Sequence, residues 1–398
     1  MSIMEHNFHL KEINHQELLM ALLSFFGHCE GIGPRGYRYK KDSVDFFLDV
    51  QLDKAGKIAK INPSNGFPCG ELNKIENKIK EILIDNQILK IGEKVGFAPQ
   101  RLEGCFRYKD LFQIIPVPDA APNPPKMMLE GHPFLLQFSY TSCPNMLINL
   151  ARQKEKSTIY VMLLNLFSNV GITLGPRYAR FFWTVCEREP NNVTSEWKCE
   201  GYSYKSFPRK TDEYTPIDNF SPIRRVPYEN YYKPLAKISN LLDFPDNLEK
   251  SFDLAFSLNP EDWKKIFTAC SWYYQATDIW KESNSSAFIA LVSAIECLID
   301  KPKKEVCKYC GQQKYGVTKG FKEFLKKYTP SFERQFPREK ELIYKVRSSL
   351  SHGLDMLMRD IEPWYFATNV RAEEQDTLQR NLSFIARTAI YNWLWNRS

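Results

Sequence analysis

Hydrophobic residues recur at two different spacings along the chain, and the spacing changes beyond its middle. In the first half they alternate over short stretches, as at Phe46, Leu48 and Val50, and a turn follows at 53–57. This alternation predicts a β-hairpin over 44–61, because successive side chains of a strand point to opposite faces. The same half has helical spacing over 16–26, 71–89 and 152–167, and strand-like runs over 132–140 and 180–185.

Two segments carry no regular pattern. Residues 116–133 are rich in proline, which cannot continue a helix or a central strand. Residues 187–234 are rich in Pro, Asn, Ser, Tyr and Arg without periodicity, so we expect an irregular connection there. Aromatic and basic residues from 202 to 232 could stack on RNA and neutralise it, although a solvated linker has the same composition.

The last part of the chain has helical spacing throughout. Asn259 is a good N-cap, Pro260 suits the first helical turn, and two acidic residues follow it. Helices are predicted over 260–280, 283–298, 321–328, 338–360 and 376–395. Several amphipathic helices with short connections indicate a helical bundle.

Together these patterns predict an α+β protein in three parts. A mixed α/β domain over 1–186, with a sensor or regulatory role, precedes the irregular connection over 187–234. An all-α domain over 235–398 completes the chain. The length of 398 residues agrees with two or three domains of ordinary size.

Composition narrows the class of protein. The chain is 43% hydrophobic and 25% charged, which is typical of a soluble globular protein. No apolar run approaches the roughly 20 residues that span a bilayer, and the polar first 16 residues contain no apolar core of a signal peptide. We therefore expect a cytoplasmic protein with reduced thiols and no membrane association. The formal net charge of +7 favours an anionic partner such as nucleic acid without establishing one.

Histidine usage draws attention to a single position in the helical part. His352 is the one histidine after His132, so a general acid or base acting there near neutral pH would be this residue. On a continuous helix over 338–360, one stripe about 80° wide is apolar, formed by Ile343, Val346, Leu350, Leu354, Leu357 and Ile361. An adjoining polar arc of about 140° carries Tyr344, Arg347, Ser348, Ser351, His352 and Asp355.

An arginine, four to six further residues and then a histidine, late in a helical bundle, resembles the signature of HEPN domains. Arg347 and His352 are separated by four residues, and the flanking Arg-Ser and His-Gly pairs resemble the Apea-like branch of that family. The helix over 287–298 resembles the family's helix with an apolar face and an acidic residue, here Glu296. The resemblance covers about residues 260–398 and implies a helical HEPN fold, to which family members often add a separate N-terminal domain.

The resemblance implies an RNA endonuclease that needs no metal or other cofactor for catalysis. His352 would act as general acid or base, Arg347 would stabilise the charged transition state, and the products would carry 2′,3′-cyclic phosphates. HEPN domains pair across a two-fold axis, which implies a homodimer or higher homo-oligomer with Tyr344, Ser348 and Ser351 beside the shared cleft. The implied setting is a prokaryotic cytoplasm, in antiviral defence by abortive infection or in a toxin-like role.

Two alternatives remain open at this point. Many catalytic HEPN motifs have Asn, Asp or His directly after the arginine, where this chain has Ser348. A non-catalytic HEPN protein that dimerises and binds RNA or a protein partner is therefore the rival interpretation. Glu296 could orient Arg347 or His352 from a neighbouring helix, or it could be a surface carboxylate.

Cys307 and Cys310 have the spacing of half a tetrahedral zinc site, and a glycine follows them. Cys270, Cys297 or a second chain could supply the remaining ligands of a structural zinc ion. Two free thiols are the alternative, and a redox pair would need a βαβ setting that the pattern does not predict. A zinc-dependent interaction module is the third function that the sequence leaves open.

Overall fold

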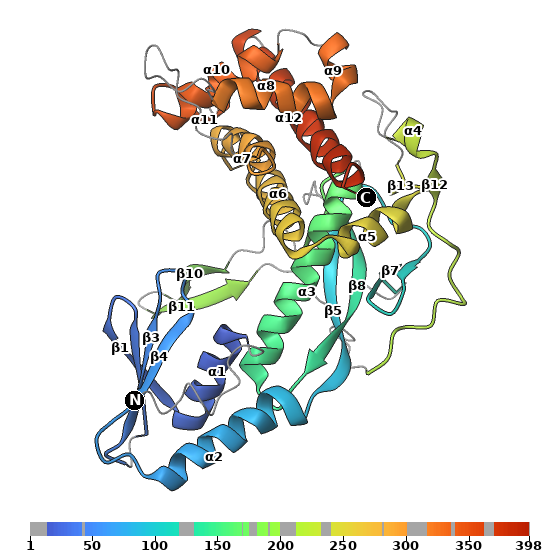
Figure 1. The fold of residues 1–398 in the computed structure, drawn as a ribbon. Coiled ribbons are helices and arrows are strands. Elements are labelled where there is room, and N and C mark those ends of the chain that lie inside the picture. Colours follow the sequence, from blue (N-terminus) through green and yellow to red (C-terminus); the bar gives the residue numbers. More distant parts are fainter. Residues whose placement is uncertain are drawn as a thin grey trace. The chain divides into compact units, whose positions relative to one another are not determined.

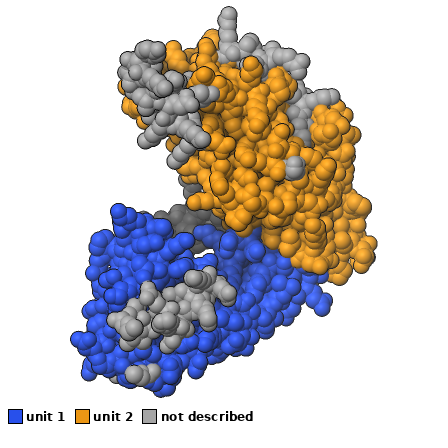
Figure 2. Space-filling view, in the orientation of Figure 1, with its two compact units in different colours: residues 1–92, 138–157, 210–214 blue, residues 93–137, 158–209, 215–398 orange. Residues whose placement is uncertain are grey.

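The chain has an α+β fold, in which antiparallel sheets lie in the N-terminal half and helices make up the C-terminal part (Figure 1). The computed structural model describes residues 14–41, 44–118, 131–168, 170–174, 181–189, 192–199, 212–231, 240–280, 282–300, 317–335, 339–361 and 370–397. Two compact units are present, and Figure 2 colours them separately. None of the helices in the described ranges is long and apolar enough to cross a bilayer.

Unit 1 comprises residues 1–92, 138–157 and 210–214. It contains an antiparallel sheet in the order β1-β2-β3-β4, formed by His28–Gly33, Gly36–Lys40, Phe47–Leu52 and Ile58–Pro63. Its helical elements are α1 (His15–Phe26), α2 (Cys69–Lys80) and the π-helical turn η1 (Glu81–Asp85). The hairpin predicted over 44–61 is confirmed as β3–β4, and the helix predicted over 16–26 is confirmed as α1.

Apolar side chains of α1, the sheet, α2 and the start of α3 (Met146–Phe167) form the core of unit 1. Leu22, Leu48, Ile75 and Ile148 are all fully buried there. The single helix predicted over 71–89 is wrong at its end. The helical part stops at Asp85, and β5 (Ile88–Ala98) starts three residues later.

Unit 2 comprises residues 93–137, 158–209 and 215–398. A five-stranded sheet has the order β6-β7-β8-β5-β9, where the new strands are Phe106–Tyr108, Phe112–Pro116, His132–Ser142 and Thr173–Leu174. The strand predicted over 132–140 is confirmed as β8. Gly96 of β5 leaves room for the Phe134 ring, because a Cβ at that position would lie 2.3 Å from it.

Shorter strands complete the β-structure of unit 2. β10 (Phe181–Glu189) and β11 (Asn192–Cys199) form an antiparallel hairpin, which covers the strand predicted over 180–185. β12 (Arg225–Val226) pairs in parallel with β13 (Phe244–Pro245), and the short helix α4 (Tyr228–Tyr231) lies between them in sequence. The segment 187–234, predicted as irregular, therefore contains regular elements.

The remaining helices belong to unit 2 and include the predicted helical region. They are α5 (Leu248–Ser257), α6 (Pro260–Ile279), α7 (Asn284–Glu296), α8 (Val317–Tyr328), α9 (Pro330–Gln335), α10 (Glu339–Ser351), α11 (Met358–Ile361) and α12 (Val370–Trp395). The long helix α12 packs against α5, α6, α7, α8, α10 and α11, as Figure 1 shows for its red ribbon. The helices predicted over 260–280 and 283–298 are confirmed as α6 and α7, whose contact is the most extensive between helices.

The compact units are divided differently from the predicted domains. Residues 93–137 and 158–186 were expected in an N-terminal domain, whereas the compact units group them with the C-terminal helices in unit 2. The strands β5 and β8 and the helix α3 each run from one unit into the other.

The continuous helix predicted over 338–360 is wrong, because α10 ends at Ser351. Gly353 has a φ of +66°, a left-handed conformation that favours glycine and ends the helix. The Leu354 N–H donates to the Ser349 carbonyl at 3.0 Å and the Gly353 N–H to the Leu350 carbonyl at 3.1 Å, the bond pattern of a Schellman motif. Leu354 consequently leaves the predicted apolar stripe and is 78% exposed.

Candidate functional site

The predicted arginine lies in an ion pair between two helices of unit 2. The Arg347 Nη2 of α10 donates to the Glu296 Oε2, at the last residue of α7, over 3.0 Å. The two side chains are 28% and 20% exposed. Glu296 therefore contacts the Arg347 side chain and is not a solvated surface carboxylate.

This ion pair does not use all the hydrogen-bonding groups of either residue. The Glu296 Oε1 is buried and accepts no hydrogen bond from any residue that the structure describes. A guanidinium carries five N–H donors, and the Glu296 Oε2 accepts the one hydrogen bond that Arg347 makes within the described ranges. Arg347 thus retains donors for a second anionic group.

The Tyr344 ring lies against the same arginine. The Arg347 Cζ is 5.8 Å from the Tyr344 ring centroid, within the range of a cation–π contact. Tyr344 in turn packs on the Phe321 ring of α8, with 5.8 Å between the ring centroids. Tyr344 and Arg347 are three residues apart, so they lie on one face of α10.

The two predicted serines lie on this face as well. Ser348 is half-buried, and Ser351, the last residue of α10, is exposed. Neither hydroxyl makes a hydrogen bond within the part of the chain that the structure describes. Small side chains at these positions leave the Arg347 face open to another surface.

His352 lies at the end of α10 and not on the continuous helical arc that the sequence predicted. Its backbone N–H donates to the Ser348 carbonyl at 3.1 Å, and Gly353 turns the chain directly after it. The imidazole is exposed, and no described residue makes a hydrogen bond with it. The histidine is therefore accessible to a ligand, with Arg347 five residues before it on the last turns of α10.

Asp360 of α11 is a residue of this region that the sequence analysis missed. Its carboxylate accepts the backbone N–H groups of Asn284 and Ser285 at 2.8 and 2.7 Å, at the first turn of α7. Burial alone would raise the pKa of Asp360, but hydrogen bonds from Ser285, Asn284 and Ser283 outweigh burial and hold the pKa below its ordinary value. The N-terminal end of α7 is thus held by α11, while its C-terminal end presents Glu296.

The predicted zinc pair, Cys307 and Cys310, lies outside the described residues. Of the other proposed ligands, Cys270 is fully buried, and desolvation raises the pKa of its thiol well above the ordinary value. Desolvation also raises the pKa of Cys297 to about 12. Zinc binds thiolates, so either cysteine would have to lose its proton on binding the metal. Among the described residues, no three or more His, Cys, Asp or Glu side chains are grouped so that they could hold a metal ion.

Part of the aromatic and basic stretch over 202–232 is described, from residue 212 onward. Arg224 is paired with Asp243 at 3.3 Å, and Arg225 is paired with Glu249. Both arginines are therefore engaged in ion pairs within unit 2.

Comparison with known proteins adds no assignment at this point. The chain matches no protein-family model, no curated protein and no solved structure. The function is consequently inferred from the residues at the end of α10 and from their resemblance to the HEPN signature.

Proposed function

We propose that the C-terminal helices form a HEPN-type domain that cleaves RNA without a metal ion. The observation that carries the proposal is the end of α10, where the exposed His352 follows an arginine that is held by Glu296 and keeps free donors. A phosphate bound to those donors would meet the exposed His352 imidazole as its general acid or base. The net charge of +7 agrees with a polyanionic substrate.

In the proposed reaction the 2′-hydroxyl of a ribose attacks the adjacent phosphorus and the bond to the 5′-oxygen breaks. The 2′-hydroxyl gives up one proton and the leaving 5′-oxygen takes one, so the reaction needs a base and an acid. Arg347 stabilises the additional negative charge on the phosphoryl oxygens, for which its planar donor fork is suited. The products are a 2′,3′-cyclic phosphate and a 5′-hydroxyl.

One imidazole does not readily serve as both base and acid. We therefore propose a homodimer in which the His352 residues of two chains meet at one cleft. The face that carries Tyr344, Ser348 and Ser351 would lie at or beside the two-fold axis, where the same surface meets itself. Ser351→Trp should split the dimer or block the cleft, and light scattering together with RNA cleavage measures both effects. A parent protein that is strictly monomeric and still fully active would exclude the composite cleft.

The experiment for the activity itself is incubation of the purified protein with total RNA in excess EDTA. Cleavage should persist, and its products should carry 2′,3′-cyclic phosphates. His352→Ala should reduce cleavage by about 10²- to 10⁴-fold, the usual contribution of general acid–base catalysis. His28→Ala is the matched control, because it removes an exposed histidine of β1 in unit 1. Cleavage that requires Mg²⁺, or a His352→Ala variant as active as the parent, would exclude this mechanism.

The rival function is a non-catalytic HEPN protein that dimerises and binds RNA or a protein partner. The Arg347–Glu296 ion pair favours it to some extent, because a paired arginine also stabilises a helix–helix contact without any chemistry. Retention of RNA binding by the parent and by His352→Ala, with no cleavage by either, would establish this alternative.

A further inference from the structure

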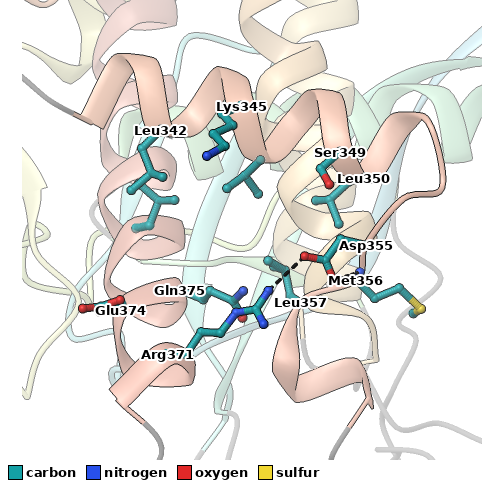
Figure 3. Close-up of a pocket in the computed structure, with 12 residues that line it drawn as sticks. Leu342, Lys345, Ser349, Leu350, Asp355, Met356, Leu357, Arg371, Glu374 and Gln375 are labelled. Carbon is teal, nitrogen blue, oxygen red and sulfur yellow. Dashed lines mark hydrogen bonds and ion pairs between the residues drawn. The ribbon is translucent and has the colours of Figure 1, made fainter.

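A pocket of about 360 Å³ lies beside α10, and Arg347 is not among the residues that line it (Figure 3). Its walls are α10, the turn over 353–357 and the first turns of α12, all in unit 2. None of the predicted site residues lines it. The lining residues are Leu342, Lys345, Val346, Ser349, Leu350, Asp355, Met356, Leu357, Arg371, Glu374, Gln375 and Leu378.

The floor of this pocket is apolar. Leu342, Val346 and Leu350 follow one another every fourth residue along α10 and all line the pocket, and Figure 3 labels Leu342 and Leu350. Leu342 is 46% exposed and Met356 is 48% exposed, so this apolar surface is only partly covered. Concave apolar surface with a few polar groups is typical of small-molecule sites.

Two basic side chains lie at the rim. Lys345 has no ion-pair partner among the residues that the structure describes. Arg371 donates to the Asp355 carboxylate at 3.0 Å, which links the first turn of α12 to the turn after α10 (Figure 3). The side chain of Glu374 extends away from Arg371 on the other side of α12. Lys345 of α10 and Arg371 of α12 are thus the basic side chains among the residues that line the pocket.

We propose that this pocket binds a small molecule with an apolar body and one anionic group, a carboxylate or a phosphate. The apolar body lies on Leu342, Val346 and Leu350, and the anion takes the place of Asp355 on Arg371. This exchange is feasible because Arg371 and Asp355 are 59% and 43% exposed, and exposed ion pairs stabilise a fold only weakly. The free energy gained on ligand binding exceeds the free energy lost with the Arg371–Asp355 ion pair, because the ligand also contacts Lys345 and buries apolar surface.

Displacement of the Asp355 carboxylate from Arg371 by the ligand would connect this pocket to His352, the proposed catalytic residue. Asp355 lies three residues after His352, on the turn that Gly353 begins. Release of Asp355 from Arg371 changes the restraint on that turn, so bound ligand should alter RNA cleavage. This regulatory part rests on the proposed function, whereas the binding part does not.

Decanoate is a suitable probe, and isothermal titration calorimetry of the full chain measures its binding. We expect saturable binding of one decanoate per chain, at least about tenfold tighter than that of decan-1-ol, which lacks the charge. Arg371→Gln should weaken decanoate binding by about ten- to a hundredfold. Asp355→Asn should tighten it by about two- to fivefold, since the variant removes the competing carboxylate.

Matched variants separate the pocket from general effects of charge. Arg359→Gln breaks the neighbouring pair with Asp376, which lies outside the lining, and should leave decanoate affinity unchanged. Leu342→Gln should weaken both decanoate and decan-1-ol by about three- to tenfold, because it removes apolar floor from a half-exposed position.

Absence of saturable decanoate binding would overturn the proposal. Equal effects of Arg371→Gln and Arg359→Gln would overturn it too, as would weaker binding by Asp355→Asn. A parent protein that cuts no RNA but binds decanoate as described would refute the proposed function and leave the pocket assigned. A parent that cuts RNA at the same rate with and without saturating decanoate would refute the regulatory part alone.

Discussion

The Arg152–Glu17 pair of unit 1 and the Arg347–Glu296 pair of unit 2 have the same chemistry, but they differ in how many of their hydrogen-bonding groups have a partner. In unit 1, Arg152 makes two parallel bonds to the carboxylate oxygens of Glu17, both at 2.6 Å, and its remaining nitrogen donates to the Thr141 carbonyl at 2.8 Å. In unit 2, Arg347 makes a single bond to one oxygen of Glu296, whose other oxygen accepts none from the described residues.

The difference shows what each arginine can still do. Each nitrogen of the Arg152 guanidinium donates to an acceptor, and the hydrogen bonds that it donates to Glu17 raise the pKa of this group further. The pair is only 13% and 17% exposed and joins α1 to α3, so its contribution is to the fold. Arg347 is more exposed and keeps donors for a ligand. The pairs should therefore respond in opposite ways to substitution.

The largest expected effect is loss of RNA cleavage when Arg347 is replaced by lysine. Lysine keeps the charge but loses the planar fork, and removal of one such transition-state donor costs about 10²- to 10³-fold in rate. The free energy of unfolding should change by about 1 kcal/mol or less, since the pair is partly exposed and singly bonded. Cleavage assays and urea unfolding of the same preparation measure the two effects. A variant that is unstable but fully active would assign Arg347 to the fold.

Arg152→Gln should have the opposite profile. Breaking this buried pair leaves the Glu17 carboxylate without its partner, so the free energy of unfolding should fall by about 3 kcal/mol. Cleavage per folded molecule should equal that of the parent. Urea unfolding followed by circular dichroism measures the stability. A decrease of less than about 1 kcal/mol in the free energy of unfolding would show that the fully hydrogen-bonded Arg152 contributes little to stability.

The Glu296–Arg347 contact was one of two alternatives that the sequence left open, whereas the end of α10 at Ser351 was not among them. The helices that carry Glu296 and Arg347 were predicted from apolar spacing, which is a local property. The end of α10 was not, because Leu354, Leu357 and Ile361 continue the helical period beyond Gly353 and only the left-handed conformation of that glycine interrupts it. The position of His352 at the helix end follows from this single residue.

Other features could not be predicted because they depend on segments that are distant in sequence. Asp360 caps α7, which begins at Asn284, and no local pattern pairs an aspartate with a helix more than seventy residues earlier. The domain boundaries predicted from the sequence differ from the boundaries of the compact units for the same reason. The strands β5 and β8 are neighbours in one sheet although they are far apart in sequence, and most of this sheet belongs to unit 2 with the C-terminal helices.

Glu296→Gln tests whether the single bond positions Arg347. The amide still accepts a hydrogen bond, but it lacks the charge that holds the guanidinium, so kcat should fall about tenfold. The KM for RNA should fall or stay constant, because Arg347 becomes more available to phosphate. A purely structural role would instead reduce the free energy of unfolding and leave kcat of the folded protein unchanged. Steady-state cleavage kinetics together with urea unfolding separate these two results.

The smallest expected effect concerns the other end of α7 and depends on pH. The folded-state pKa of Asp360 lies below the ordinary value of 3.8, so the unfolded chain binds the proton more readily. The contribution of Asp360 to stability is therefore present above about pH 4 and is lost as the pH falls through the folded-state pKa.

Asp360→Asn removes this charged cap and should lower the free energy of unfolding by about 1 kcal/mol at pH 7, the usual contribution of a capping side chain. The difference from the parent should shrink when urea unfolding is repeated near pH 3. RNA cleavage at pH 7 should be unchanged, because the helix is perturbed at Asn284 and not at Glu296. A stability difference that is the same at both pH values would show that the Asp360 carboxylate caps α7 without a depressed pKa. A loss of cleavage would show that the two ends of α7 are mechanically coupled, so that Arg347 depends on the cap as well as on Glu296.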